Sequence, residues 1–205
     1  MTIPRFSTVL CADWSTAFTS RAVYAAETSD AFSVRRVVRH TWTLSTLLAE
    51  ARARASRGPV LVAIDAPVGV PHGYLAAVRA DHPSVTTFPA LLTISSRWER
   101  FFDAVGTATE WTLERPFFRV PAGPGARTAF DGAARVQGVP SLRRLIDHRT
   151  RANSLFITAG IHGSVGSATC DLWREVRDLL PSRDIALWPF DGDPRTHCGR
   201  RTASC

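Results

Sequence analysis

Two aspartates follow the two most apolar short runs of the sequence. Asp13 comes directly after the run 8–12, and Asp65 comes directly after the run 60–64. Two carboxylates held close together repel each other, and a divalent cation between them relieves that repulsion. Bound Mg²⁺ or Mn²⁺ can polarise a phosphodiester and activate a water molecule. We therefore expect Asp13 and Asp65 to be metal ligands and catalytic residues, against the alternative that each merely caps the following turn.

The elements that must position these aspartates can be read from the first third of the chain. Three valine- and alanine-rich runs, 8–12, 22–26 and 34–38, are too closely spaced for helical crossovers, which predicts an antiparallel meander of strands. Apolar residues then recur at helical spacing between Thr43, a suitable N-cap, and the stop formed by Gly58 and Pro59. The continuous apolar run 60–64 suits a buried strand. The expected order is therefore β-β-β-α-β.

This order predicts an α/β fold with a mixed sheet of the RNase H-like type and flanking helices, because the early meander argues against a Rossmann strand order. If the first and fourth strands are neighbours, Asp13 and Asp65 emerge at the same edge of the sheet, where open α/β sheets bind their ligands. The rest of the chain is expected to be mostly helical at first. A helix at 96–105 would begin with a capping box at Ser96 and Glu99, and a weakly structured Gly/Pro/Ala-rich loop would follow at about 119–140. The last expected elements are a short helix at 141–147, a strand at 155–158, a helix at 172–180 and a strand at 185–188.

Several segments together resemble an uncharacterised family of predicted RNase H-like nucleases. The segments that carry the resemblance are VLCADWS at 9–15, AIDAPVGVP at 63–71, RANSLFITAG at 151–160, VGSA at 165–168 and ALWPFDGD at 186–193. The resemblance implies a compact RNase H-like domain with acidic residues on the first and fourth strands, and a metal-dependent nuclease activity. The alternatives are a catalytically degenerate or non-enzymatic protein that retains the fold, and an ATPase-like nucleotide-binding module.

The chain departs from the family pattern where a third carboxylate is expected. Members of the family continue after a WPF-type strand through a helix and a strand that bears an acidic residue, whereas here DPRTHCGRRTASC follows. Asp147 is the substitute that we name as a third catalytic residue, with Asp191 and Asp193 as further candidates. The ATPase alternative rests on residues 13–16, which are similar to the first phosphate loop of actin-like ATPases but lack its glycine.

Composition limits the partners, cysteine sites and cellular location that we expect. The 205 residues carry a net charge of +7, and every cationic side chain apart from histidine is arginine, which permits a nucleic-acid partner without requiring one. Four cysteines without a CxxC pair indicate neither a zinc cluster nor a disulfide framework. No apolar run is long enough for a membrane span and no secretory signal is apparent, so we expect a cytoplasmic protein without a membrane partner. We expect one domain over residues 1–193 and a disordered tail over 194–205, because the tail lacks large apolar side chains.

Overall fold

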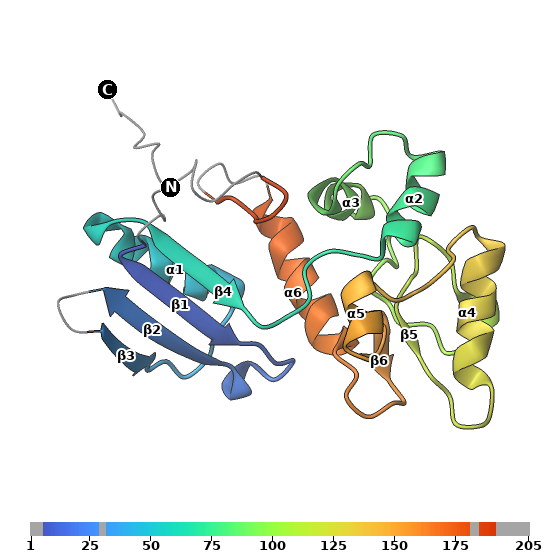
Figure 1. The fold of residues 1–205 in the computed structure, drawn as a ribbon, viewed down its shortest axis with the longest axis horizontal. Helices are drawn as coiled ribbons and strands as arrows, with labels where there is room; N and C mark the ends of the chain where they lie inside the picture. The colour runs from blue at the N-terminus through green and yellow to red at the C-terminus, as the bar shows by residue number, and fades with distance from the viewer. Residues whose placement is uncertain (1–5, 29–31, 181–184, 192–205) are drawn as a thin grey trace. The chain divides into compact units, whose positions relative to one another are not determined.

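The computed structural model describes residues 6–28, 32–180 and 185–191, which form two compact units. The first unit contains the chain up to Asp65 together with the described residues after 180, and the second runs from Ala66 to Leu180. The architecture is mixed α/β (Figure 1). The tail at 194–205 and the predicted domain boundary at 193 lie outside the described residues.

The first unit is built on a four-stranded sheet of order β3-β2-β1-β4. Its strands are β1 (Thr8–Asp13), β2 (Ala22–Thr28), β3 (Phe32–Val37) and β4 (Val60–Ile64). β1 pairs antiparallel with β2 and parallel with β4, while β2 pairs antiparallel with β3. The predicted β-β-β-α-β order and the adjacency of the first and fourth strands are confirmed.

Helix α1 (Leu44–Arg54) covers one face of this sheet (Figure 1). It begins where predicted, since the Thr43 side chain accepts a hydrogen bond from the Thr46 amide. A 3₁₀ turn at Ala55–Arg57 and Gly58 at φ 140° end it before β4, and another 3₁₀ turn (Phe18–Ser20) lies between β1 and β2. Leu47 on the helix and Leu10 and Val23 on the sheet are fully buried, so this face forms the unit's core.

The second unit packs short helices around a two-stranded parallel sheet. The sheet is formed by β5 (Phe118–Arg119) and β6 (Ile157–Ala159). The helices are α2 (His72–Asp81), α3 (Phe88–Ser95), α4 (Ala126–Val136), α5 (Leu145–Arg149) and α6 (Gly166–Leu179), with a 3₁₀ turn at Ala108–Glu110. Aromatic side chains form the core; the Trp173 ring lies 4.8 Å from Phe88 and 5.6 Å from Phe117, edge to face in both cases.

Two predicted features of the second unit are wrong. No helix forms at the expected range 96–105. The helix of this region is α3, which begins after its N-cap Thr87 and ends at Ser96, whose hydroxyl donates a hydrogen bond to the Thr93 carbonyl. The expected loop at 119–140 contains α4, which is stabilised by the stacking of Phe130 on Phe118 at 4.2 Å. Apolar spacing is hard to see there because small residues separate the buried positions.

The strand predicted at 185–188 is also wrong. Residues 185–187 have no regular secondary structure, and a turn follows at 188–191. This turn is held by local hydrogen bonds. The Phe190 amide donates to the Leu187 carbonyl, and the Leu187 amide donates to Asp191 Oδ2. The other late elements are confirmed with shifted bounds, since α5, β6 and α6 overlap the ranges expected for them.

Candidate metal centre at the ends of β1 and β4

Asp13 is the last residue of β1, and Asp65 directly follows β4, the parallel neighbour of β1 in the first unit's sheet. Ala12 is the register partner of Ile64, and the Asp65 amide donates to the Ala12 carbonyl at 3.1 Å, so the ladder continues to the aspartates. Both aspartates are exposed. The structure therefore places the two residues next to each other, as the strand pattern predicted.

The pleat of the sheet places Asp13 on the face opposite α1. Cys11 and Ala63 are register partners and both are exposed, whereas Ala12, which lies between Cys11 and Asp13, is buried. Because side chains alternate along a strand, residues two positions after an exposed register pair return to the same face. Asp13 thus lies on the face opposite α1, while Asp65, the first residue after β4, directs its carboxylate to the backbone that follows β1.

The two carboxylates have different surroundings. Asp65 Oδ1 accepts a hydrogen bond of 2.7 Å from the Trp14 backbone amide, which fixes the orientation of that carboxylate. Within the described ranges, the Asp13 carboxylate has neither a hydrogen bond nor an ion pair. An oriented carboxylate beside an unpaired one is suited to a hard cation, since Mg²⁺ and Mn²⁺ prefer oxygen ligands.

A buried arginine fixes the loop that follows Asp13. The Arg21 guanidinium lies 3.9 Å from the centre of the Trp14 ring and 4.4 Å from that of Phe18. Its Nε donates to the Ser15 carbonyl at 2.6 Å, and its Nη1 donates to the Trp42 carbonyl at 2.9 Å. Arg21 is only 2% exposed, so it ties the loop to the chain before α1.

The role of Arg21 could not be predicted from the sequence. Its partners are backbone carbonyls and aromatic rings, and such contacts produce no recognisable residue pattern in the sequence. The only signal available was an arginine immediately before a predicted strand and close to two aromatic residues. Trp14 is buried, and its indole Nε1 has no hydrogen-bond partner among the described residues.

Asp147 belongs to the second unit, where its buried carboxylate forms contacts that stabilise the start of α5. Its side chain is 4% exposed and forms an ion pair with Arg144, with Oδ1 and Nη2 separated by 2.7 Å. Its Oδ2 also accepts from the Arg144 amide at 2.8 Å and from Arg144 Nε at 3.0 Å, which caps the start of α5. These contacts occupy both carboxylate oxygens, and a catalytic role for Asp147 stays a prediction.

Of the two remaining acidic candidates, the structure describes only Asp191. Asp191 Oδ2 accepts from the Leu187 amide at 2.6 Å, and Asp193 lies outside the described residues. Within the described part of the chain, no group of three or more His, Cys, Asp or Glu side chains is placed to hold a metal ion.

Comparison of the chain with family models, curated proteins and solved structures gives no match. Among the described residues, no helix combines the length and the apolar character needed to cross a membrane. Function must therefore be inferred from the residues and contacts themselves.

Proposed function

We propose that Asp13 and Asp65 bind Mg²⁺ or Mn²⁺ and that the chain is a metal-dependent phosphodiesterase of the RNase H-like type acting on nucleic acid. The observation that carries the proposal is the parallel pairing of β1 with β4, which brings both aspartates to the same edge of the sheet. The β-β-β-α-β order supports it, because RNase H-like folds begin in this way.

The chemistry follows from the oxygen ligands available. A cation held by Asp13 and Asp65 would keep several water molecules, since two carboxylates fill only part of an octahedral shell. Such a cation can bind a phosphate oxygen of the substrate and lower the pKa of a bound water molecule. The fixed Asp65 carboxylate would set the cation's position, and Asp13 would complete the pair.

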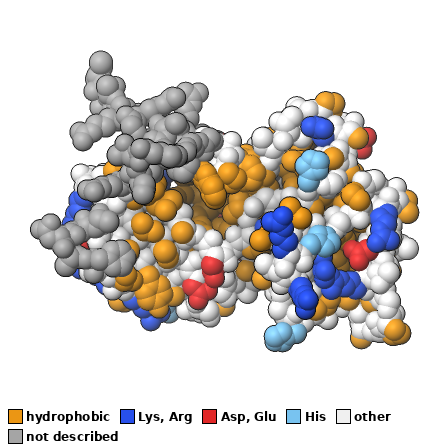
Figure 2. All heavy atoms as spheres, viewed as in Figure 1, with side chains coloured by type: hydrophobic (Ala, Val, Ile, Leu, Met, Phe, Trp, Pro, Cys, Tyr) orange, Lys and Arg blue, Asp and Glu red, His pale blue; other side chains and the backbone are white. Residues whose placement is uncertain are grey.

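Arginines of the second unit support a nucleic-acid partner. Burial and the nearby charge of Arg143 lower the pKa of Arg127. The Arg143 Nε is buried without a hydrogen-bond partner among the described residues. Arginine side chains gather over α4 and α5 in Figure 2. Two neighbouring guanidinium groups are suited to phosphate oxygens.

A cation-binding protein without catalysis is the second candidate. The observation that favours it is that the described residues bring no third acidic, histidine or cysteine side chain to a shared metal site. In that case the cation would still bind at Asp13 and Asp65, but substrate would not be cleaved.

The experiment that tests the proposal measures cleavage of single-stranded DNA, single-stranded RNA and an RNA–DNA duplex with Mg²⁺, Mn²⁺ or a chelator. We expect cleavage that requires the cation and that falls at least 100-fold in Asp13→Asn. Asp81→Asn is the matched control, because Asp81 is exposed at the end of α2. Cation binding without cleavage of any of the three would select the second candidate, and cleavage that survives in Asp13→Asn would refute the assigned site.

Binding to the same nucleic acids at increasing salt tests the partner. Phosphate contacts release counterions, so affinity should fall steeply between 50 and 200 mM salt, on the order of tenfold or more for a few contacts. Arg127→Gln should weaken binding and reduce this salt dependence, whereas a flat response to salt would argue against a surface that contacts phosphates.

A further inference from the structure

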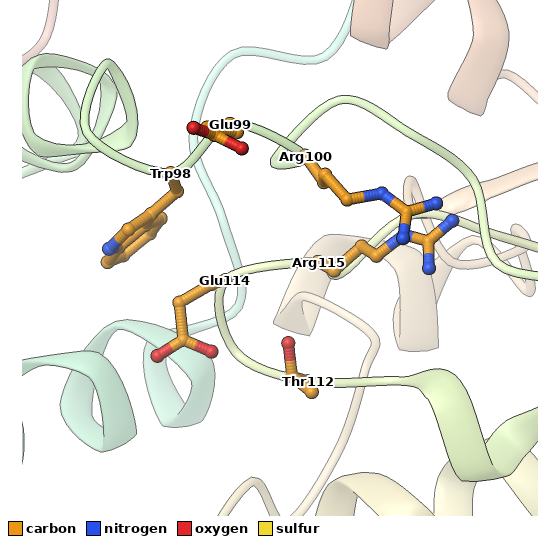
Figure 3. Close-up of a pocket in the computed structure, with 6 residues that line it drawn as sticks. All are labelled: Trp98, Glu99, Arg100, Thr112, Glu114 and Arg115. Atoms are coloured by element: carbon orange, nitrogen blue, oxygen red, sulfur yellow. The ribbon is translucent and has the colours of Figure 1, made fainter.

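A pocket of about 310 Å³ in the second unit is lined by both arginine and glutamate side chains. It lies between the turn after α3 and the turn at 112–115, where the Arg115 amide donates to the Thr112 carbonyl at 3.1 Å. Figure 3 shows the side chains that line it, which are Trp98, Glu99, Arg100, Thr112, Glu114 and Arg115. None of these residues belongs to the candidate metal centre.

Two guanidinium groups converge at one side of the pocket. Arg100 Nε lies 3.4 Å from Asp103 Oδ2, and Arg115 Nε donates to the Asp103 carbonyl at 3.3 Å, so both groups are held at the same residue. In Figure 3 both point to the same side of the pocket. Neighbouring cations held in this way favour an anion between them.

The terminal nitrogens of these arginines have no hydrogen-bond acceptor within the described residues, although Arg115 Nη1 forms a long ion pair with Glu110. The Arg115 side chain is only 16% exposed, and its closest acidic atom, Glu110 Oε1, is 3.9 Å from Nη1, too far for a hydrogen bond. Within the described residues, no Nη atom of Arg100 or Arg115 has a hydrogen-bond partner. The partly shielded Nη atoms of Arg115 thus lack close acceptors, and a phosphate group would supply them.

The opposite side of the pocket carries an aromatic ring and two carboxylates. The Trp98 ring is half-buried and is held by ring contacts with His82 at 5.5 Å and Phe101 at 5.6 Å. Neither Glu99 nor Glu114 has a hydrogen bond or an ion pair within the described residues. In Figure 3 the Glu114 side chain extends to the side of the turn away from the guanidinium groups.

We propose that this pocket binds a nucleoside monophosphate, with guanosine monophosphate preferred. The phosphate would lie between Arg100 and Arg115, and the base would lie against Trp98, because indole rings stack well on nucleobases. A carboxylate accepts hydrogen bonds but donates none, so Glu114 selects a base edge with two adjacent N–H donors. Guanine presents such an edge, whereas adenine, cytosine and uracil each place an acceptor beside a donor.

Titration of the full chain in the presence of a metal chelator tests this site separately from the metal centre. The probes are guanosine, adenosine, cytidine and uridine 5′-monophosphates, guanosine and inorganic phosphate, and binding is followed by calorimetry and tryptophan fluorescence. We expect guanosine monophosphate to bind at least tenfold more tightly than guanosine, phosphate or the other three nucleotides. Equal affinity for inorganic phosphate, or no binding of any nucleotide at millimolar concentration, would overturn the proposal.

Variants locate the binding site. Arg100→Gln should weaken guanosine monophosphate binding at least tenfold, and Arg97→Gln is the matched control because Arg97 is exposed in the same segment but does not line the pocket. Glu114→Gln should remove most of the preference for guanine while retaining phosphate-dependent binding. Unchanged affinity in Arg100→Gln refutes the site.

A final probe separates a free nucleotide from a strand end. We expect the same oligonucleotide with a 5′-phosphorylated guanosine and with a 5′-hydroxyl guanosine to bind with equal affinity, whatever the rest of the strand contributes. A phosphorylated form that binds tenfold more tightly, and loses this advantage in Arg100→Gln, would reassign the pocket to strand ends and overturn the free-nucleotide proposal. Failure of the metal-centre proposal would leave these expected results unchanged, because every measurement is made without a divalent cation.

Discussion

The Trp14 amide donates a 2.7 Å hydrogen bond to Asp65 Oδ1 and so joins the segment after β1 to the end of β4. Asp65 is therefore oriented by the neighbouring strand, while Asp13, the residue directly before Trp14, has no partner for its carboxylate within the described residues. Both aspartates come directly after an apolar run of the sequence, but in the part of the chain that the structure describes only Asp65 has a carboxylate that a hydrogen bond holds in place.

This inequality predicts opposite effects of two substitutions on stability. Asp65→Ala loses a charge-assisted hydrogen bond and should lower the free energy of unfolding by about 1 kcal/mol. Asp13→Ala removes one of two neighbouring negative charges and should leave stability unchanged or slightly raised. Denaturant unfolding in the presence of a chelator measures both, and a larger loss in Asp13→Ala would contradict this assignment of roles.

Arg21→Lys should destabilise the loop that follows Asp13. Lysine keeps the charge, but it lacks the planar fork that donates to the Ser15 and Trp42 carbonyls while stacking on Trp14. We expect a loss of about 1–3 kcal/mol in unfolding free energy. Arg39→Lys is the comparison, since Arg39 is exposed beside the Trp42 ring and should change stability by less than about 0.5 kcal/mol.

The sheet of the first unit was predictable because its signals are local. Valine-rich runs, a threonine N-cap and a glycine–proline stop each act over a few residues, and the structure has strands and a helix where they indicated. The second unit was harder because burial there depends on distant partners. Ser96 looks like an N-cap from its neighbours, yet it ends α3, since Thr87 and Pro89 have already started that helix.

The site was predictable only in part for the same reason. Asp13 and Asp65 stand out because each follows an apolar run, and strand order alone predicts that they are neighbours. The contacts of Arg21, and the convergence of Arg100 and Arg115 at Asp103, depend on chain segments that meet only after folding.

Two glycines should respond oppositely to alanine. Gly160 has φ +91°, and a Cβ there would lie 1.9 Å from the Val120 carbonyl oxygen, so Gly160→Ala should destabilise the second unit by more than about 2 kcal/mol. Gly132 lies inside α4, where a Cβ would meet nothing within 4 Å, so Gly132→Ala should stabilise by about 0.5–1 kcal/mol. Thermal unfolding of both variants measures the difference, and equal midpoints would show that the close approach at Gly160 is wrong.

Two cysteines should differ in reactivity. Burial raises the pKa of the Cys170 thiol to about 12, and this thiol donates to the Phe102 carbonyl at 3.3 Å. The folded protein should therefore keep Cys170 protonated and unlabelled by iodoacetamide from pH 7 to 10, whereas exposed Cys11 should be alkylated. Peptide mapping by mass spectrometry distinguishes the two sites, and comparable labelling of Cys170 in the native protein would contradict its burial.

The most direct test of the account is the location of a bound cation in crystals of the full chain grown with Mn²⁺. The account predicts an anomalous difference peak about 2.0–2.3 Å from carboxylate oxygens of both Asp13 and Asp65. The same peak should be absent from crystals of Asp13→Asn and present in those of Asp81→Asn. A peak that persists at this edge in Asp13→Asn, or wild-type crystals in which Mn²⁺ binds elsewhere and leaves the pair empty, would contradict the central claim.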